Sequence, residues 1–273
     1  MLRSQNLKLV LVAGLGPVLF CPTTLAAVEA MESSVLRVEV TASPFSFRIV
    51  ERSTGYVLLS ESRTAFTKKR YRATEAAEFT KVPNTLGTTL TIQGSANKAH
   101  VTFSFLKPEV FRVLLAYGDD PGGEIYEEFS DQGEHYYGIW EYPFGGNIDN
   151  RGADQDFLGV QHEPDVNYSN ARAPFYVTSR KYGLYVESTA KGHYAIANAG
   201  KTDFSFYESP LKYDFIYGPS YSDILNRYNA LAGPPVEGRQ PRRPARRQQR
   251  PRASDQRRRP VEGPAHTRWC HMA

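Results

Sequence analysis

The sequence predicts an all-β protein: an antiparallel β-sandwich, followed by one helix and a disordered tail. Aromatic residues make up 12% of the 273 residues, with 17 Tyr and 15 Phe, and these residue types favour strands. The 21 Gly and 18 Pro supply turns. Short segments that alternate apolar and polar residues recur at roughly ten-residue spacing, which is typical of sandwiches and barrels.

Residues 1–27 have the pattern of a secretory signal sequence. Two basic residues precede an apolar run at 9–20, and small residues follow it up to Ala27. We expect cleavage after Ala26 or Ala27 and a secreted or periplasmic product. The run is too short to be a convincing membrane anchor, and no later run of about 20 apolar residues occurs, so no transmembrane segment is expected.

The body of the chain, residues 28–219, is expected to form the sandwich. Its apolar residues recur at every second position in short segments. The expected strands are 35–41, 45–50, 56–59, 88–92, 99–105, 110–116, 175–178, 182–187, 193–197, 204–206 and 213–217. The stretch 119–170 is Gly-rich and polar and is expected to be a long loop, which is either functional or poorly ordered.

Residues 220–235 predict a helix that ends at a Pro sequence and connects the sandwich to a following segment. Ser220 is a capping residue, and Asp223 stands three positions later, the spacing of a capping box. The helix is expected to present one apolar face and to end at a Gly-Pro-Pro sequence. The expected face consists of Ile224, Leu225, Tyr228 and Leu231.

Sequence motifs provide little direct evidence for a catalytic centre. The histidines lack the spacing of metal ligands, and the chain has neither a nucleophile elbow nor a phosphate-binding loop. No metal and no cofactor are therefore predicted, and no catalytic residue is assigned.

Two features are candidates for substrate contact. The first is an acidic stretch with Asp154 and Asp156 at its centre, flanked by Asp149 and Asp165, which could hold a carboxylate pair or calcium; solvated turn formers are the preferred interpretation. The second is Trp140, which could stack on a sugar ring, although packing against the core is the preferred interpretation.

Several segments together resemble glycoside hydrolase family 31. Residues 134–141, Glu-His-Tyr-Tyr-Gly-Ile-Trp-Glu, resemble the family's "YGxGE" element, with Trp140 in place of its second glycine. The later segments 173–186 and 214–219 follow in the family's order, and the helix ends in 228–235 as the family's junction with its barrel does. The resemblance covers about residues 35–235.

The resemblance implies a galactose-mutarotase-like N-terminal sandwich from a retaining α-glycosidase, such as an α-glucosidase or α-xylosidase. In that family the catalytic aspartates lie on a following (β/α)₈ barrel, whose motifs we do not find here. The chain is therefore expected to be inactive by itself, truncated before the barrel that would be its partner in cis. Its ligand would be a carbohydrate, an α-glycoside. Asp154 or Asp156 would stand where the family has a "WNxD" loop that reaches the substrate.

Residues 236–273 form a tail of different composition. They contain 11 Arg, no Lys and three acidic residues, a net charge of +8, whereas residues 1–235 carry a net charge of −4. The preferred interpretation is a shifted reading frame, because the change begins where the family resemblance ends. A basic arm that binds anionic polymers is the alternative. In either case the tail is expected to be disordered.

Because the body is mildly acidic, no specific nucleic-acid binding is expected. Two functions remain open besides the family 31 domain. The chain could be a free-standing secreted carbohydrate-binding sandwich, or a polyanion-binding protein that acts through its Arg-rich tail.

Overall fold

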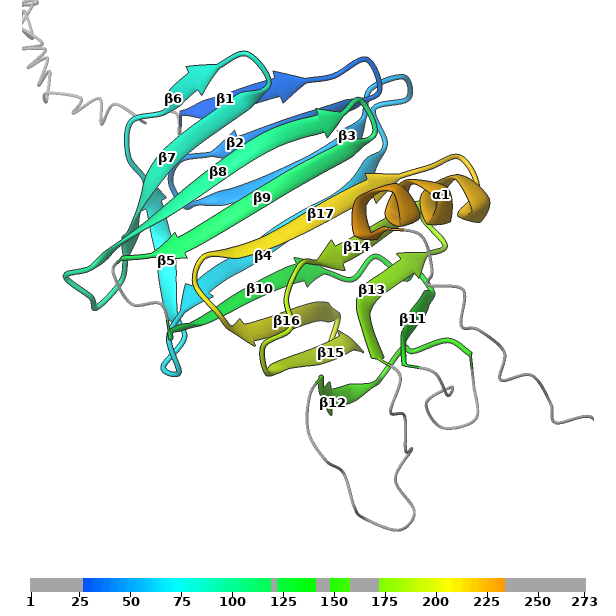
Figure 1. Cartoon of the computed structure of the whole chain (residues 1–273). Coiled ribbons are helices and arrows are strands. Elements are labelled where there is room, and N and C mark those ends of the chain that lie inside the picture. Colours follow the sequence, from blue (N-terminus) through cyan, green and yellow to red (C-terminus); the bar gives the residue numbers. More distant parts are fainter. Residues whose placement is uncertain (1–26, 119–121, 141–147, 158–171, 234–273) are drawn as a thin grey trace, which may run out of the picture. The chain divides into compact units, whose positions relative to one another are not determined.

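A computed structural model describes residues 27–118, 122–140, 148–157 and 172–233. Almost all of the predicted signal sequence and the whole segment 236–273 lie outside the described residues. The described part contains seventeen strands and one helix, and every strand pairing in it is antiparallel (Figure 1). The all-β prediction is confirmed.

The strands form two layers. In the first layer each strand pairs with the next in a continuous order. That order is β1 (Val28–Glu32), β2 (Leu36–Thr41), β3 (Ser46–Glu51), β4 (Val57–Phe66), β10 (Glu124–Ser130), β16 (Lys201–Tyr207), β15 (Gly192–Asn198) and β12 (Asp154–Asp156). Strands far apart in the sequence thus become neighbours, as β4 and β10 do.

The second layer begins with β5 (Tyr71–Ala76) and β6 (Thr80–Val82), which both pair with β7 (Thr85–Ile92). The layer continues through β8 (Lys98–Lys107), β9 (Val110–Tyr117), β17 (Leu211–Tyr217), β14 (Tyr182–Val186), β13 (Arg172–Thr178) and β11 (Tyr136–Trp140). Strand β5 also pairs with the end of β4, through Phe66 and Tyr71, and so joins the two layers at one corner.

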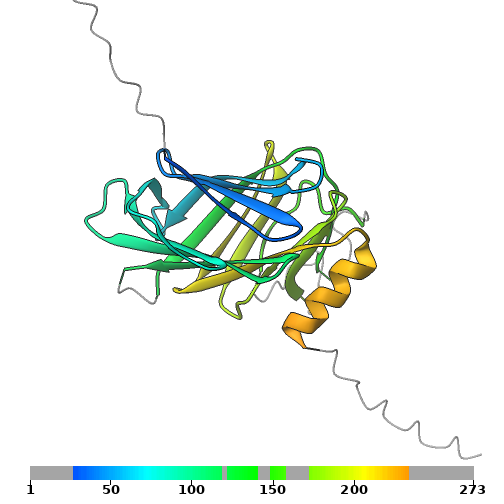
Figure 2. The ribbon, with the colours of Figure 1, turned by 90° about the horizontal axis from the view of Figure 1, so that it is seen from above.

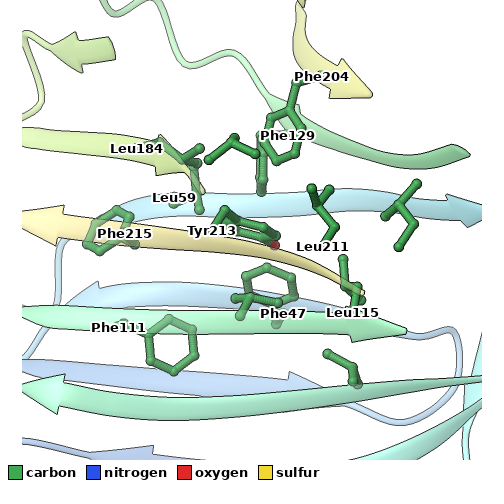
Figure 3. Packing of buried hydrophobic residues seen from close by; sticks show 14 of the residues in the cluster. Phe47, Leu59, Phe111, Leu115, Phe129, Leu184, Phe204, Leu211, Tyr213 and Phe215 are labelled. Atoms are coloured by element: carbon green, nitrogen blue, oxygen red, sulfur yellow. The ribbon is translucent and has the colours of Figure 1, made fainter. Parts of the chain in front are cut away.

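Aromatic side chains fill the space between the layers (Figure 3). The Phe47 ring of β3 lies 5.2 Å from Phe103 of β8, measured between ring centroids. The Phe204 ring of β16 lies 5.3 Å from that of Tyr213 in β17. Because these contacts cross from one layer to the other, the alternating Phe and Tyr of the sequence are the core that holds the layers together.

All eleven predicted strands coincide with strands of the structure, whereas the predicted long loop at 119–170 is partly wrong. It contains β10, β11 and β12. Strand β10 shows no apolar alternation, because Glu127 faces the core and its neighbours Tyr126 and Glu128 are also buried on the other side. A strand buried on both faces loses the period of two by which a strand is recognised in a sequence.

The predicted helix is α1 (Tyr221–Ala232), with the expected capping box formed by Ser220 and Asp223. Seen from above, it lies on the outside of the strands (Figure 2). Ile224 is fully buried, but Leu225 is 46% exposed, so its assignment to the packed face is wrong. Consecutive helical residues point about 100° apart. The stripe of Ile224, Tyr228 and Leu231 meets the sheet, and Tyr221 packs edge-on against Tyr137 of β11. No described helix is long and apolar enough to cross a membrane.

Candidate functional site

The outward-facing side chains of β4, β10, β16, β15 and β12 form a surface that we call the polar face. Residues opposite one another in an antiparallel pair point to the same side of the sheet. The strand register therefore lines up two rows on this face. One row is Arg63, Glu128, Asp203, Ala195 and Asp154, and the other is Ala65, Tyr126, Ser205, His193 and Asp156.

Asp154 and Asp156, the two carboxylates singled out in the sequence, lie at the edge of the polar face. Two positions apart on β12, they point to the same side and enclose one imidazole. The Nε2 of His193 lies 2.9 Å from Asp154 Oδ1, and its Nδ1 lies 3.1 Å from Asp156 Oδ1. The Nδ1 contact with Asp156 is a hydrogen bond, and the Nε2 contact with Asp154 lies within ion-pair distance.

This carboxylate pair is accessible to a ligand. The side chains of Asp154 and Asp156 are 55% and 51% exposed, and that of His193 is 29% exposed. Lys191 Nζ approaches Asp156 at 3.8 Å, and Asn198 donates a 3.2 Å hydrogen bond to Asp154. The cluster thus combines acceptors and donors at a surface, which is the chemistry that sugar hydroxyls recognise.

Farther along the polar face the acidic groups are less exposed. Burial raises the pKa of Asp203 to about 6, against the opposing effect of the positive charge on Arg70. Burial also raises the pKa of Glu128, but hydrogen bonds from Lys201, Tyr126 and Ser62 outweigh it and leave that pKa below its ordinary value. Asp203 therefore titrates at mildly acidic pH, near 6, whereas Glu128 stays charged.

Trp140 lies at the end of β11, on the other layer. Its indole packs edge-on against Tyr194, with 6.5 Å between ring centroids, and its Nε1–H is buried without an acceptor among the described residues. The preceding Gly138 has a φ of 115°, and a Cβ there would lie 2.7 Å from the Phe175 carbonyl oxygen. The close approach of β11 to β13 therefore requires glycine at this position. The register of the β11–β13 pair shifts between Gly138 and Trp140.

Hydrogen bonds hold the segment around the "YGxGE"-like element in place. Asp149 accepts from the backbone N–H of Tyr136 at 3.0 Å and contacts His135 Nδ1 at 2.6 Å. Arg151 forms a bidentate pair with Asp131, at 2.9 and 2.8 Å. Burial raises the pKa of Asp149, but the contacts of its carboxylate with Tyr136 N–H, His135 and Arg151 N–H outweigh burial and lower the pKa. Asp149 therefore anchors the chain beside β11.

A second carboxyl pair is sealed inside the sandwich. Glu61 and Glu127 are 3% and 0% exposed. Thr64 donates to Glu127 at 2.7 Å, and the Tyr213 hydroxyl donates to its other oxygen at 2.9 Å. Burial raises the pKa of Glu127 to about 8 and raises that of Glu61 well above its ordinary range. Neither carboxyl group is exposed to solvent.

The sequence-predicted residues thus fall into two places. Asp154 and Asp156 come together around His193, whereas Trp140 belongs to the other layer and packs inward. Asp165 lies outside the described residues. The two aspartates stand at positions i and i+2 of one strand, a spacing that predicts a shared side. Their partner His193 is 37 residues beyond Asp156, and only the sheet register reveals it.

Metal binding finds no support within the described ranges. They contain no group of three or more His, Cys, Asp or Glu residues that could hold a metal ion. Both nitrogens of His193 already face carboxylates.

No protein-family profile matches the chain. Among curated proteins it is similar to the α-xylosidase XylQ of Lactiplantibacillus pentosus, with 36% identity over 62 residues, which is 22% of this chain and 8% of that protein. It is also similar to an isomaltosyltransferase of Sporosarcina globispora, with 30% identity over 118 residues, which is 40% of this chain and 10% of that protein.

Among solved structures, the cycloalternan-forming enzyme from Listeria monocytogenes, in complex with a pentasaccharide substrate, matches 72% of this chain with a TM-score of 0.52 and 15% identity. A GH31 family sulfoquinovosidase from E. rectale, in complex with an aza-sugar inhibitor, also matches 72% of this chain, with a TM-score of 0.48 and 17% identity. The matched part is 25% and 29% of those two chains. This chain therefore matches only a small part of each relative.

Proposed function

The chain is related to glycoside hydrolase family 31 enzymes, and we propose that it serves as the N-terminal β-sandwich domain of such an enzyme. In this proposal the whole enzyme hydrolyses O-glycosyl bonds of α-glycosides, and this domain contributes carbohydrate contacts. The sandwich occupies residues 28–219 and α1 connects it to a catalytic barrel. One observation carries the proposal. The two sequence matches, an α-xylosidase and an isomaltosyltransferase, and the fold match, a cycloalternan-forming enzyme, are all enzymes that act on carbohydrates.

The two carboxyl pairs described above, Glu61 with Glu127 and Asp154 with Asp156, support a non-catalytic role for this domain. Retaining glycosidases place two carboxyl groups about 5–5.5 Å apart on either side of an open sugar site. Glu61 and Glu127 are sealed in the core, and Asp154 and Asp156 both hold one imidazole. In the proposal the nucleophile and the acid come from the barrel, and Asp154 or Asp156 touches the sugar.

The purified chain tests this proposal directly. We expect no turnover of 4-nitrophenyl α-glucoside or α-xyloside above that of a mock preparation from the same host. Turnover that co-purifies with the chain and matches no contaminant would overturn the non-catalytic role.

Carbohydrate contact is tested by calorimetry with malto- and xylo-oligosaccharides. We expect weak, saturable binding that Asp154→Asn and Asp156→Asn both reduce. Asp223→Asn is the matched control, because it also replaces an aspartate with asparagine, but at the cap of α1. It should leave binding unchanged. Absence of heat with every oligosaccharide would contradict a role in sugar contact.

Secretion is part of the proposal and rests on the signal-like residues 1–27. A free-standing secreted carbohydrate-binding sandwich predicts tight oligosaccharide binding without any barrel. The polyanion-binding alternative predicts salt-sensitive retention on heparin that disappears when residues 236–273 are deleted. Calorimetry and heparin chromatography of the same preparation separate these alternatives.

A further inference from the structure

A basic cleft lies on the polar face, at the corner where β5 leaves β4. Its volume is about 640 Å³, and β4, β5, β10, β16 and the turn after β7 line it. Four cationic side chains from three strands and a turn converge there, against one carboxylate in the lining. They are Arg63, Arg70, Arg72 and Lys201, and the carboxylate is Glu128.

Two of these cations are already neutralised. Lys201 Nζ lies 2.8 Å from Glu128 Oε1. The guanidinium of Arg70 stacks 4.4 Å from the centre of the Tyr126 ring and lies 3.7 Å from Glu124. Glu128, the carboxylate of the cleft, thus pairs with Lys201 and does not form an ion pair with Arg63 or Arg72.

Arg63 and Arg72 have no carboxylate within ion-pair distance among the described residues. Each donates one hydrogen bond from a terminal nitrogen to a backbone carbonyl. Arg63 donates to the carbonyl of Arg70 at 3.0 Å, and Arg72 donates to the carbonyl of Ser62 at 3.3 Å. The Nε of Arg63 is buried and has no acceptor. A buried charged donor without a partner is costly, so Arg63 keeps unused hydrogen-bonding capacity beside the cleft.

We propose that this cleft binds the oxyanion group of a small acidic ligand, the carboxylate of a uronic acid or the sulfate of a sulfated sugar. Guanidinium groups match both oxyanions because their planar forks donate two parallel hydrogen bonds. The volume lies within the range of small-molecule sites, about 300–1,000 Å³, and exceeds what a bare ion needs. That a sugar carries the oxyanion rests on the proposed function, whereas the preference for an oxyanion rests on the cleft alone.

The test is calorimetry on the full chain at constant ionic strength, with sodium chloride as the balancing salt. The probes are sodium sulfate, sodium D-glucuronate, D-glucose 6-sulfate and neutral D-glucose. Arg63→Gln and Arg72→Gln each remove one uncompensated guanidinium. Arg48→Gln is the control, because it removes the same charge from β3, where Arg48 pairs with Glu39 outside the cleft. The Arg-rich tail is present in every variant, so its contribution cancels.

We expect saturable binding of sulfate and of at least one acidic sugar, and no saturable binding of glucose. Each cleft variant should weaken binding about tenfold or more, and the control should leave it unchanged. Binding of glucuronate but not of glucose 6-sulfate identifies a carboxylate ligand, and the reverse identifies a sulfate ester.

Absence of saturable binding of sulfate and of both acidic sugars, or equal losses in all three variants, would overturn the proposal. Thermal melting of each variant shows whether it is folded, and Arg72→Gln, at an exposed position, provides the measurement if Arg63→Gln unfolds. Arg63→Lys keeps the charge and should still lose affinity, because it loses the fork. Sulfate binding without any binding of neutral oligosaccharides would count against the proposed function and leave this site intact.

Discussion

The two outer surfaces of the sandwich differ in what lies on them. On the second layer, α1 covers β14 and β17 and packs Ile224 against Ile216 and Phe175. A Cβ at Gly183 would lie 2.8 Å from the side chain of Ile224, so the strand lacks a side chain where the helix sits. On the first layer, the corresponding outward positions form the polar face, with Arg63, Glu128, Asp203 and His193.

The difference shows how one strand pattern produces a structural and a functional surface. Outward positions that a helix covers are apolar or glycine, because burial of an apolar side chain is favourable and burial of an unpaired charge is not. Several outward positions of the first layer, which α1 does not cover, carry charged side chains, among them Arg63, Glu128 and Asp203. We therefore expect substitutions on the covered side to change stability, and substitutions on the polar face to change binding.

The largest effect is expected under the helix. Ile224→Ala should lower the free energy of unfolding by about 2–5 kcal/mol, because it leaves a cavity in the Ile216–Phe175 cluster. Leu225→Ala, one residue along and 46% exposed, should change it by less than about 0.5 kcal/mol. Urea unfolding followed by circular dichroism measures both. Similar losses in the two variants would show that α1 does not bury the face described here.

The next largest effect is the pH dependence of stability that comes from the buried pair Glu61 and Glu127, on the core side of β10. In the folded state the pKa of Glu127 is raised from 4.5 to about 8 by burial, and the pKa of Glu61 is also raised. The folded state then holds protons that the unfolded state releases. The resulting stability is fully present below about pH 4.5 and is lost as the pH rises toward 8, at up to about 1.4 kcal/mol per pH unit for each group.

The double variant Glu61→Gln/Glu127→Gln should remove most of this slope between pH 6 and 8, above the pKa of about 6 at Asp203, and Glu127→Gln alone should reduce it. Urea unfolding at several pH values measures the slope. Glu78→Gln, at an exposed position, is the control and should keep the wild-type slope. An unchanged slope in the double variant would show that the buried pair is not the source. Glu128, on the polar face, contributes in the opposite sense, because its lowered pKa makes it stabilising only as a carboxylate.

A smaller effect is expected at the start of α1. Ser220→Ala removes the side-chain cap of the Asp223 N–H and should cost about 1 kcal/mol. Ser222→Ala, in the same turn but exposed, is the matched control. Urea unfolding measures the loss, and hydrogen exchange at the first helical turn should accelerate only in the Ser220 variant. Equal behaviour of the two serine variants would argue against the capping box.

The smallest effect on stability is expected at the edge of the polar face. Asp156→Asn removes one exposed partner of His193 and should change the melting temperature by an amount equivalent to less than about 1 kcal/mol. The same substitution is expected to reduce oligosaccharide binding. A large loss of stability would mean that the Asp154–His193–Asp156 cluster holds the fold rather than a ligand.

The sequence by itself determined the fold class, the positions of eleven strands and the capping box of α1. These features are local: alternation of apolar residues, turn residues and a capping pair act within a few positions of one another. The alternation fails at β10, where Tyr126 and Glu128 are buried on the side opposite Glu127, because contacts from distant strands decide the burial there.

Only the tertiary structure decided what surrounds the carboxylates of Asp154 and Asp156. His193 reaches them because β12 pairs with β15, and Arg63 meets Lys201 in one cleft because β10 lies between β4 and β16. Both juxtapositions depend on which strands become neighbours and in what register. That choice is made by the packing of the whole aromatic core, with Phe204 and Tyr213 joining the layers, and no segment of the sequence contains it alone.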